Sequence, residues 1–121
     1  MATVVPKITY NIVFQPNVVN KLSNIYPYDR CTVNFYSNVH IKQFYARATF
    51  EDAVWDYDTG TLIAEFNNRD ANTQLSFDII CGQHLLSGDG TYRIGLYLQN
   101  DNDVWNLEEI FLTTESNNTN K

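Results

Sequence analysis

Residues 86–114 read LSGDGTYRIGLYLQNDNDVWNLEEIFLTT, and this stretch decides the fold class of the chain. A Gly-Asp-Gly turn at residues 88–90 leads into a run that is apolar at every second position, namely Tyr92, Ile94, Leu96 and Leu98. A polar turn at residues 100–103 separates this run from a second extended run. Alternation with a period of two is typical of a strand with one buried face, so the stretch predicts a β-hairpin.

The same alternation recurs in the rest of the chain. Five further segments show it: Lys7–Phe14, Cys31–Tyr36, Ile41–Phe50, Thr61–Phe66 and Leu75–Cys81. The segment 15–30 contains two prolines and predicts a loop with at most one short element, and the Asn-rich segment 67–72 predicts a turn. With no stretch of helical period, the sequence predicts an all-β, antiparallel sandwich of about seven strands, with a small closed barrel as the competing architecture.

One domain accounts for the length of the chain. The 121 residues suffice for a single core, which we place in residues 1–115, and the polar residues 116–121 are expected to form a disordered tail. The sequence lacks a secretory leader and has no apolar run of the roughly 18 residues that span a bilayer. The sequence therefore leaves the compartment unknown, and it is compatible with a virion, with the cytoplasm and with the mature part of a longer protein.

The residues Asp89-Gly90-Thr91-Tyr92 resemble the tyrosine-corner segment of immunoglobulin-like domains. The resemblance implies an immunoglobulin-like sandwich and a structural role for Tyr92, whose hydroxyl would bond back to the preceding connection. The alternative is that Tyr92 is an ordinary core aromatic. A second likeness runs from the Ala-x-Ala-x-Phe strand at Ala46–Phe50 to the final hairpin, and is similar to the immunoglobulin-like modules of phage baseplate and tail-accessory proteins.

The charge of the chain argues against nucleic acid and membranes as partners. The formal net charge is −6, and the eight basic residues are scattered without a run. Binding to phosphate backbones or anionic lipids needs clustered Lys and Arg. The two cysteines, Cys31 and Cys81, lie at apolar alternation positions, so we expect buried free thiols in preference to a disulfide.

The sequence contains no recognisable arrangement of catalytic residues. His40 and His84 lie in predicted connections facing solvent, without a nucleophile on a strained turn beside them, and no glycine-rich phosphate loop occurs. We therefore expect a non-catalytic protein without a cofactor. Asp56 and Asp58, in Asp-x-Asp-x-Gly, begin like a calcium loop, but the distal Glu is missing, so a solvated acidic turn is favoured over a metal site.

Two aromatic sets carry the functional hypotheses. Tyr36, Tyr45 and Tyr97 alternate out of phase with their strands' core residues and predict a protein interface on an outer sheet face. Sugar sites pair an aromatic ring with carboxylates or amides. The alternative is therefore a small carbohydrate-binding module, whose candidate residues are Trp55, Tyr57, Trp105 and Asp103.

The sequence thus predicts a structural or adaptor module acting through protein–protein contacts, or through self-assembly. A phage or virus particle component is its most specific form. Glycan binding is the alternative.

Overall fold

The computed structural model describes residues 5–15, 21–23, 30–50, 60–86 and 90–115. These residues form eight strands and no helix. The strands are β1 (Ile8–Gln15), β2 (Lys21–Ser23), β3 (Arg30–Ser37), β4 (Ile41–Phe50), β5 (Thr61–Arg69), β6 (Leu75–Ile80), β7 (Gly90–Gln99) and β8 (Trp105–Glu115). The predicted tail, 116–121, lies outside the described residues.

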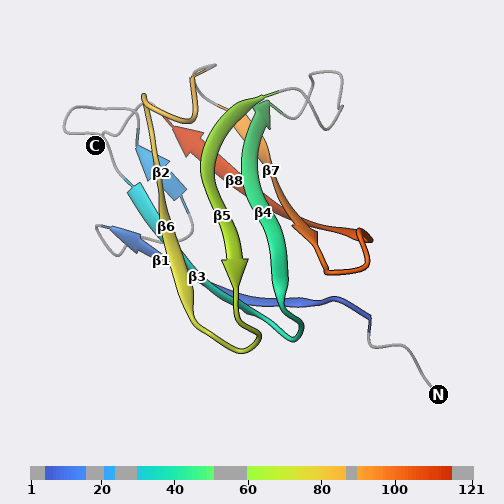
Figure 1. Cartoon of the computed structure of the whole chain (residues 1–121). Helices are drawn as coiled ribbons and strands as arrows, with labels where there is room; N and C mark the ends of the chain where they lie inside the picture. The colour runs from blue at the N-terminus through green and yellow to red at the C-terminus, as the bar shows by residue number, and fades with distance from the viewer. Residues whose placement is uncertain (1–4, 16–20, 24–29, 51–59, 87–89, 116–121) are drawn as a thin grey trace.

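The strands make two sheets, and the fold is a β-sandwich (Figure 1). One sheet has the order β1-β3-β6 and the other the order β2-β8-β7-β4-β5. Consecutive strands β5 and β6 lie in different sheets, so the chain crosses from one layer to the other between them. All pairings are antiparallel except that of β2, which runs parallel to the end of β8.

The segment between β1 and β3 contains one short element, as the sequence allowed: the three residues of β2, Lys21–Ser23, pair with the exposed edge of β8. One segment differs from the sequence prediction. Strand β5 runs three residues beyond Phe66, where a turn was predicted, because Asn67 and Arg69 still pair with β4. Asn68 tolerates the left-handed conformation it adopts there (φ 54°), as asparagine often does.

Phenylalanines fill the centre of the sandwich. The rings of Phe35 and Phe44, from opposite sheets, stack with centroids 4.4 Å apart, and Phe66 and Phe77 pack around them. Side chains of the alternating inward positions close the core, and nearly all are fully buried. The inward faces of the two sheets thus pack against each other, so contacts with other molecules must use the outer faces.

Candidate functional site: an aromatic cleft on the five-stranded sheet

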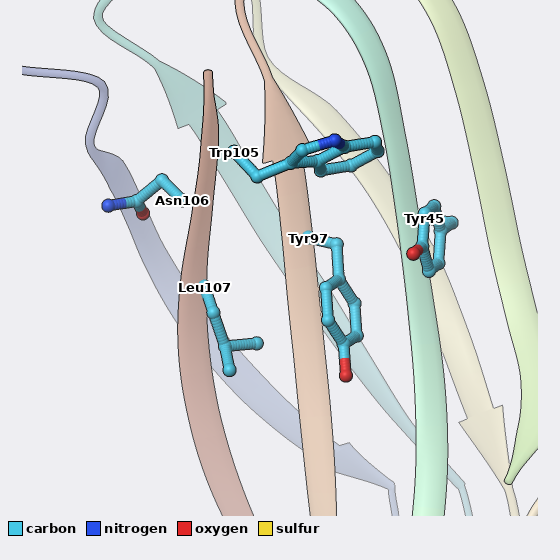
Figure 2. A pocket seen from close by; sticks show the side chains of 5 residues that line it. All are labelled: Tyr45, Tyr97, Trp105, Asn106 and Leu107. Carbon is cyan, nitrogen blue, oxygen red and sulfur yellow. The ribbon is translucent and has the colours of Figure 1, made fainter. Parts of the chain in front are cut away.

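A cleft of about 350 Å³ opens on the outer face of the five-stranded sheet (Figure 2). We call it the aromatic cleft, and the residues that line it are Tyr45, Tyr97, Trp105, Asn106 and Leu107. They come from the three adjacent strands β4, β7 and β8. The cleft therefore exists only when the sheet is assembled.

Strand register places these side chains in one row. Tyr45 on β4 pairs with Tyr97 on β7, and Tyr97 pairs with Leu107 on β8. Directly opposed residues of antiparallel strands project on the same face of the sheet. Trp105 lies two residues before Leu107 and therefore on the same face, and in Figure 2 its indole reaches from β8 above Tyr97 toward Tyr45.

The two tyrosines form the floor of the cleft. Their rings stack with centroids 4.8 Å apart, and the Trp105 ring meets Tyr45 edge-on at 5.6 Å. The guanidinium of Arg47 lies 5.4 Å from the centroid of the Tyr45 ring. Tyr45 and Tyr97 point outward as their alternation indicates, but neighbouring side chains leave them only 8% and 6% exposed. The sequence prediction of exposed tyrosines is in this respect wrong.

The accessible apolar surface lies instead on β8. Trp105, Leu107 and Phe111 are 43%, 41% and 53% exposed, and we call them the apolar stripe. Between them Glu109 forms an ion pair with Arg93 of β7, at 3.9 Å. Sequence reasoning missed Leu107 and Phe111. The signal was present, because β8 is apolar at inward Ile110 and Leu112 as well as at outward positions, and a strand with two apolar faces needs two partners.

The remaining candidate residues do not join this site. Tyr36 lies on β3, in the other sheet, and is 40% exposed. It therefore does not form one patch with Tyr45 and Tyr97. Trp55, Tyr57, Asp56 and Asp58 lie outside the described residues.

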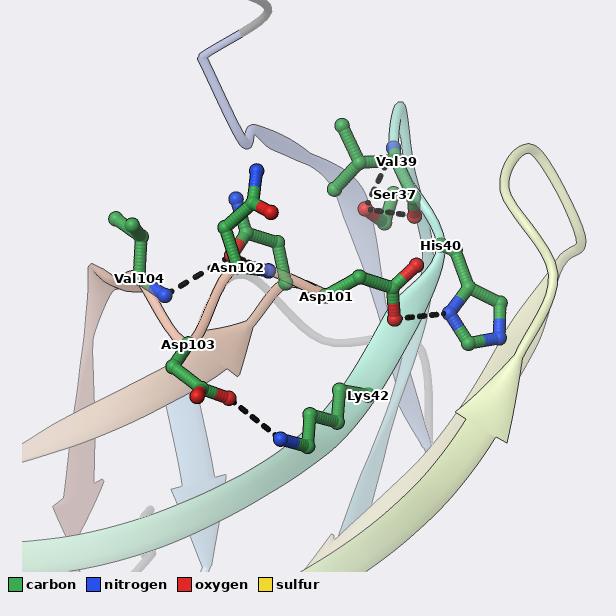
Figure 3. Close-up of polar contacts among 9 residues, drawn as sticks. Ser37, Val39, His40, Lys42, Asp101, Asn102, Asp103 and Val104 are labelled. Atoms are coloured by element: carbon green, nitrogen blue, oxygen red, sulfur yellow. Dashed lines mark hydrogen bonds and ion pairs between the residues drawn. The ribbon is translucent and has the colours of Figure 1, made fainter.

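Asp103 lies in the turn between β7 and β8 and is not among the residues that line the aromatic cleft, and Figure 3 shows its carboxylate directed at Lys42. The Asn100 side-chain oxygen accepts hydrogen bonds from the backbone N–H groups of Asn102 and Val104, both at 2.9 Å. Asp103 pairs with Lys42 at 2.5 Å, and Asp101 with His40 at 2.8 Å. These pairs attach the turn to the start of β4. The carboxylate of Asp103, which the sequence analysis assigned to a candidate sugar site, is thus already paired with Lys42.

The core contains the other residues singled out in the sequence. Tyr92 is 2% exposed and packs edge-on against Phe50, while its corner hydrogen bond stays a prediction. Cys31 and Cys81 are buried free thiols, as predicted, and burial together with the proximity of Cys81 raises the pKa of Cys31 to about 12. A thiol with so high a pKa is a poor nucleophile at neutral pH.

His84 is only partly exposed, contrary to the prediction of a solvent-facing side chain. Its Nδ1 accepts a hydrogen bond from the backbone N–H of Ile80 at 3.1 Å. Burial lowers the pKa of His84, and the carboxylate of Asp78 opposes this shift. Its geometry indicates a neutral ring that fixes the turn after β6.

The described ranges contain no group of three or more His, Cys, Asp or Glu side chains able to hold a metal ion. In the same residues no helix is long and apolar enough to cross a membrane. No protein-family model, curated protein or solved structure matches the chain. The aromatic cleft and the apolar stripe are therefore the observations from which we argue the function of this face.

Proposed function

We propose that the chain is a non-catalytic adaptor that binds protein through the outer face of its five-stranded sheet, with the aromatic cleft at the centre. The observation that carries this proposal is the apolar stripe. Trp105, Leu107 and Phe111 are each more than two-fifths exposed, and all lie on one face of one strand. Large apolar side chains gathered on one exposed face of a folded domain mark contact sites, and tryptophan in particular anchors interfaces.

The size of the face suits a protein partner. Strands β5, β4, β7 and β8 contain 9 to 11 residues each. At about 4.8 Å between strands and about 3.3 Å per residue, they present a face of roughly 600 Å². A stable interface buries about 800 Å² per partner, so the face together with the adjoining turns approaches this size.

The charges of the face favour a second copy of the chain as the partner. The chain as a whole carries −6, but beside the aromatic cleft the cations Arg47 and Arg93 lie among the anions Glu65 and Glu109. A face that mixes both signs of charge can approach its own copy without the repulsion that two acidic surfaces would suffer. Contact of a face with itself is also the arrangement of the commonest oligomers, twofold dimers.

The lining of the aromatic cleft favours protein over carbohydrate. Asn106 is the only amide that lines it, and in Figure 2 its side chain points away from the aromatic rings. Sugar hydroxyls need several convergent polar groups. An apolar side chain of a partner would instead fill the space between Trp105 and Leu107 with little loss of hydrogen bonding.

A component of a phage or virus particle remains the most specific form of the proposal. It rests on the resemblance to immunoglobulin-like phage modules and on the strand order. Strands β4, β7 and β8 lie side by side, as strands C, F and G do in immunoglobulin domains. Repeated packing in a particle would use the same self-complementary face.

Sedimentation velocity over a wide range of concentration tests the proposal. Leu107→Arg introduces a charge into the face, whereas Val13→Arg introduces the same charge at a position of equal exposure on the other sheet. We expect concentration-dependent dimers of the natural chain and of Val13→Arg, and monomers of Leu107→Arg. Dimers that survive Leu107→Arg would refute the assignment of the face.

A chain that stays monomeric throughout would exclude the second copy. Photocrosslinking in source cells, with a photoreactive residue at Leu107 or at Val13, then asks whether another protein covers the face. An adduct that forms from Leu107 and not from Val13 would support the adaptor function, provided that the crosslinked protein, once purified, binds the natural chain but not Leu107→Arg. The absence of such an adduct would refute the adaptor function.

A further inference from the structure

A second cleft, of about 190 Å³, lies on the three-stranded sheet, in the opposite layer from the aromatic cleft. All its lining residues except Phe35 carry a hydrogen-bonding group in the side chain, namely Thr9, Tyr10, Asn11, Asn34, Tyr36 and Gln74, and we call it the amide cleft. Nothing in the proposed protein-contact function uses it. The sequence singled out only Tyr36, and assigned that residue to a different surface.

Strand register explains why these residues meet. Thr9 pairs with Tyr36, and Asn11 with Asn34, so two neighbouring rows project from the outer face of β1 and β3. Asn34 also pairs with Ser76 of β6, and Gln74 directly precedes β6, which brings it to the row of Tyr36. The sheet itself therefore holds the cleft in place, and no loop has to close over it.

The chemistry of the amide cleft is neutral and rich in hydrogen-bonding groups. None of its lining residues carries a formal charge. Three of them are carboxamides, and each carboxamide offers both donors and an acceptor. Within the described part of the chain, no hydrogen bond or ion pair engages the side chains of Asn11, Asn34 or Gln74. Tyr36 adds an aromatic ring that is 40% exposed.

We propose that the amide cleft binds one residue of a neutral carbohydrate. A charged ligand would lose hydration there without meeting an opposite charge, and a wholly apolar ligand would leave the amides without partners. A pyranose satisfies both conditions, because its hydroxyls can donate and accept while its C–H face lies on the ring of Tyr36. An extended peptide fits less well, since peptides add to the edges of sheets through their backbone, and this cleft lies on a face.

Saturation-transfer NMR with millimolar methyl glycosides of glucose, galactose, mannose and N-acetylglucosamine tests the proposal. We expect transfer to the C–H protons of at least one glycoside. Tyr36→Ala and Asn34→Ala should each weaken binding about tenfold, as loss of one stacking or hydrogen-bonding contact does. Tyr36→Phe, which keeps the ring, should retain binding, and so should Trp105→Ala, because Trp105 lies on the other sheet.

Several results would overturn the assignment. They are an absence of transfer from every glycoside, transfer that Tyr36→Ala leaves unchanged, and transfer lost in Trp105→Ala instead. Amide spectra of each variant establish that it is folded. Leu107 does not line the amide cleft, so the Leu107→Arg variant should bind the glycoside as the natural chain does. A failure of sugar binding can therefore be distinguished from a failure of the protein-contact function.

Discussion

Truncating the floor of the aromatic cleft should destabilise the fold. Tyr45 and Tyr97 lie on the outer face of the sheet, yet they are more than nine-tenths buried and stack at 4.8 Å. From the sequence alone, replacing them would be expected to leave the fold intact. The structure instead predicts that Tyr45→Ala and Tyr97→Ala each lower the free energy of unfolding substantially.

The size of the effect follows from burial and stacking. An aromatic side chain buries at least about 150 Å², worth about 4 kcal/mol at 25 cal/mol per Å², and this is an upper value because the unfolded chain is itself partly compact. We therefore expect about 3 kcal/mol for each substitution. A stacked pair adds about 1 kcal/mol of its own, so the double variant should lose about 1 kcal/mol less than the two single variants together.

Urea unfolding of the natural chain, both single variants and the double variant measures these quantities as a double-mutant cycle. The free energy of unfolding of a small domain is about 5–15 kcal/mol in total, so the single variants should remain folded. Tyr97→Phe is the control, because it keeps the ring and should lose little. A loss below about 1 kcal/mol for Tyr97→Ala, or a coupling energy of zero, would refute the view that the tyrosines are a buried floor.

Two further predictions concern titratable groups, one in the core and one in the turn after β6. Because the pKa of Cys31 is raised from 9.0 to about 12, the native protein should resist iodoacetamide at pH 8 and react fully in urea, and its stability should fall as the pH rises from 9 toward 12. Alkylation of Cys31 in native protein at the rate of a free thiol would contradict this. Because burial lowers the pKa of His84 below 6.5, the stability of the natural chain should fall as the pH drops through 6.5. The stability of His84→Gln should fall by less over the same range. Equal pH dependence of the two proteins between pH 7.5 and 5.5 would count against a neutral His84 ring.

Much of the fold could be predicted from the sequence because one periodicity governs it. Ile41–Phe50 has the predicted bounds, and the other long strands differ from prediction at their ends. Strand ends depend on pairing partners that local sequence does not encode, as the extension of β5 beside β4 shows. The three residues of β2 have no periodicity to detect, and they form a strand only because β8 offers an edge.

The site was less predictable because it depends on neighbouring strands. Alternation indicates that Tyr45 and Tyr97 point outward, but their exposure depends on neighbours from other positions and strands, as the contacts of Trp105 and Arg47 with the Tyr45 ring show. Likewise, alternation places Tyr36 on an outer face without indicating which sheet. The pairing of Tyr45 with Tyr97, and of Thr9 with Tyr36, assigns these tyrosines to opposite layers.

The two outer faces of the sandwich differ in chemistry, and this difference has a functional consequence. The face with Trp105, Leu107 and Phe111 is suited to bury apolar surface against protein, whereas the face with Asn11 and Asn34 is suited to exchange hydrogen bonds with a hydrated ligand. Because the phenylalanine core lies between the layers, substitutions on one face reach the other only through the stability of the whole domain. Leu107→Arg and Tyr36→Ala should therefore act independently, so that a folded variant that loses both self-association and sugar binding would argue against two separate sites.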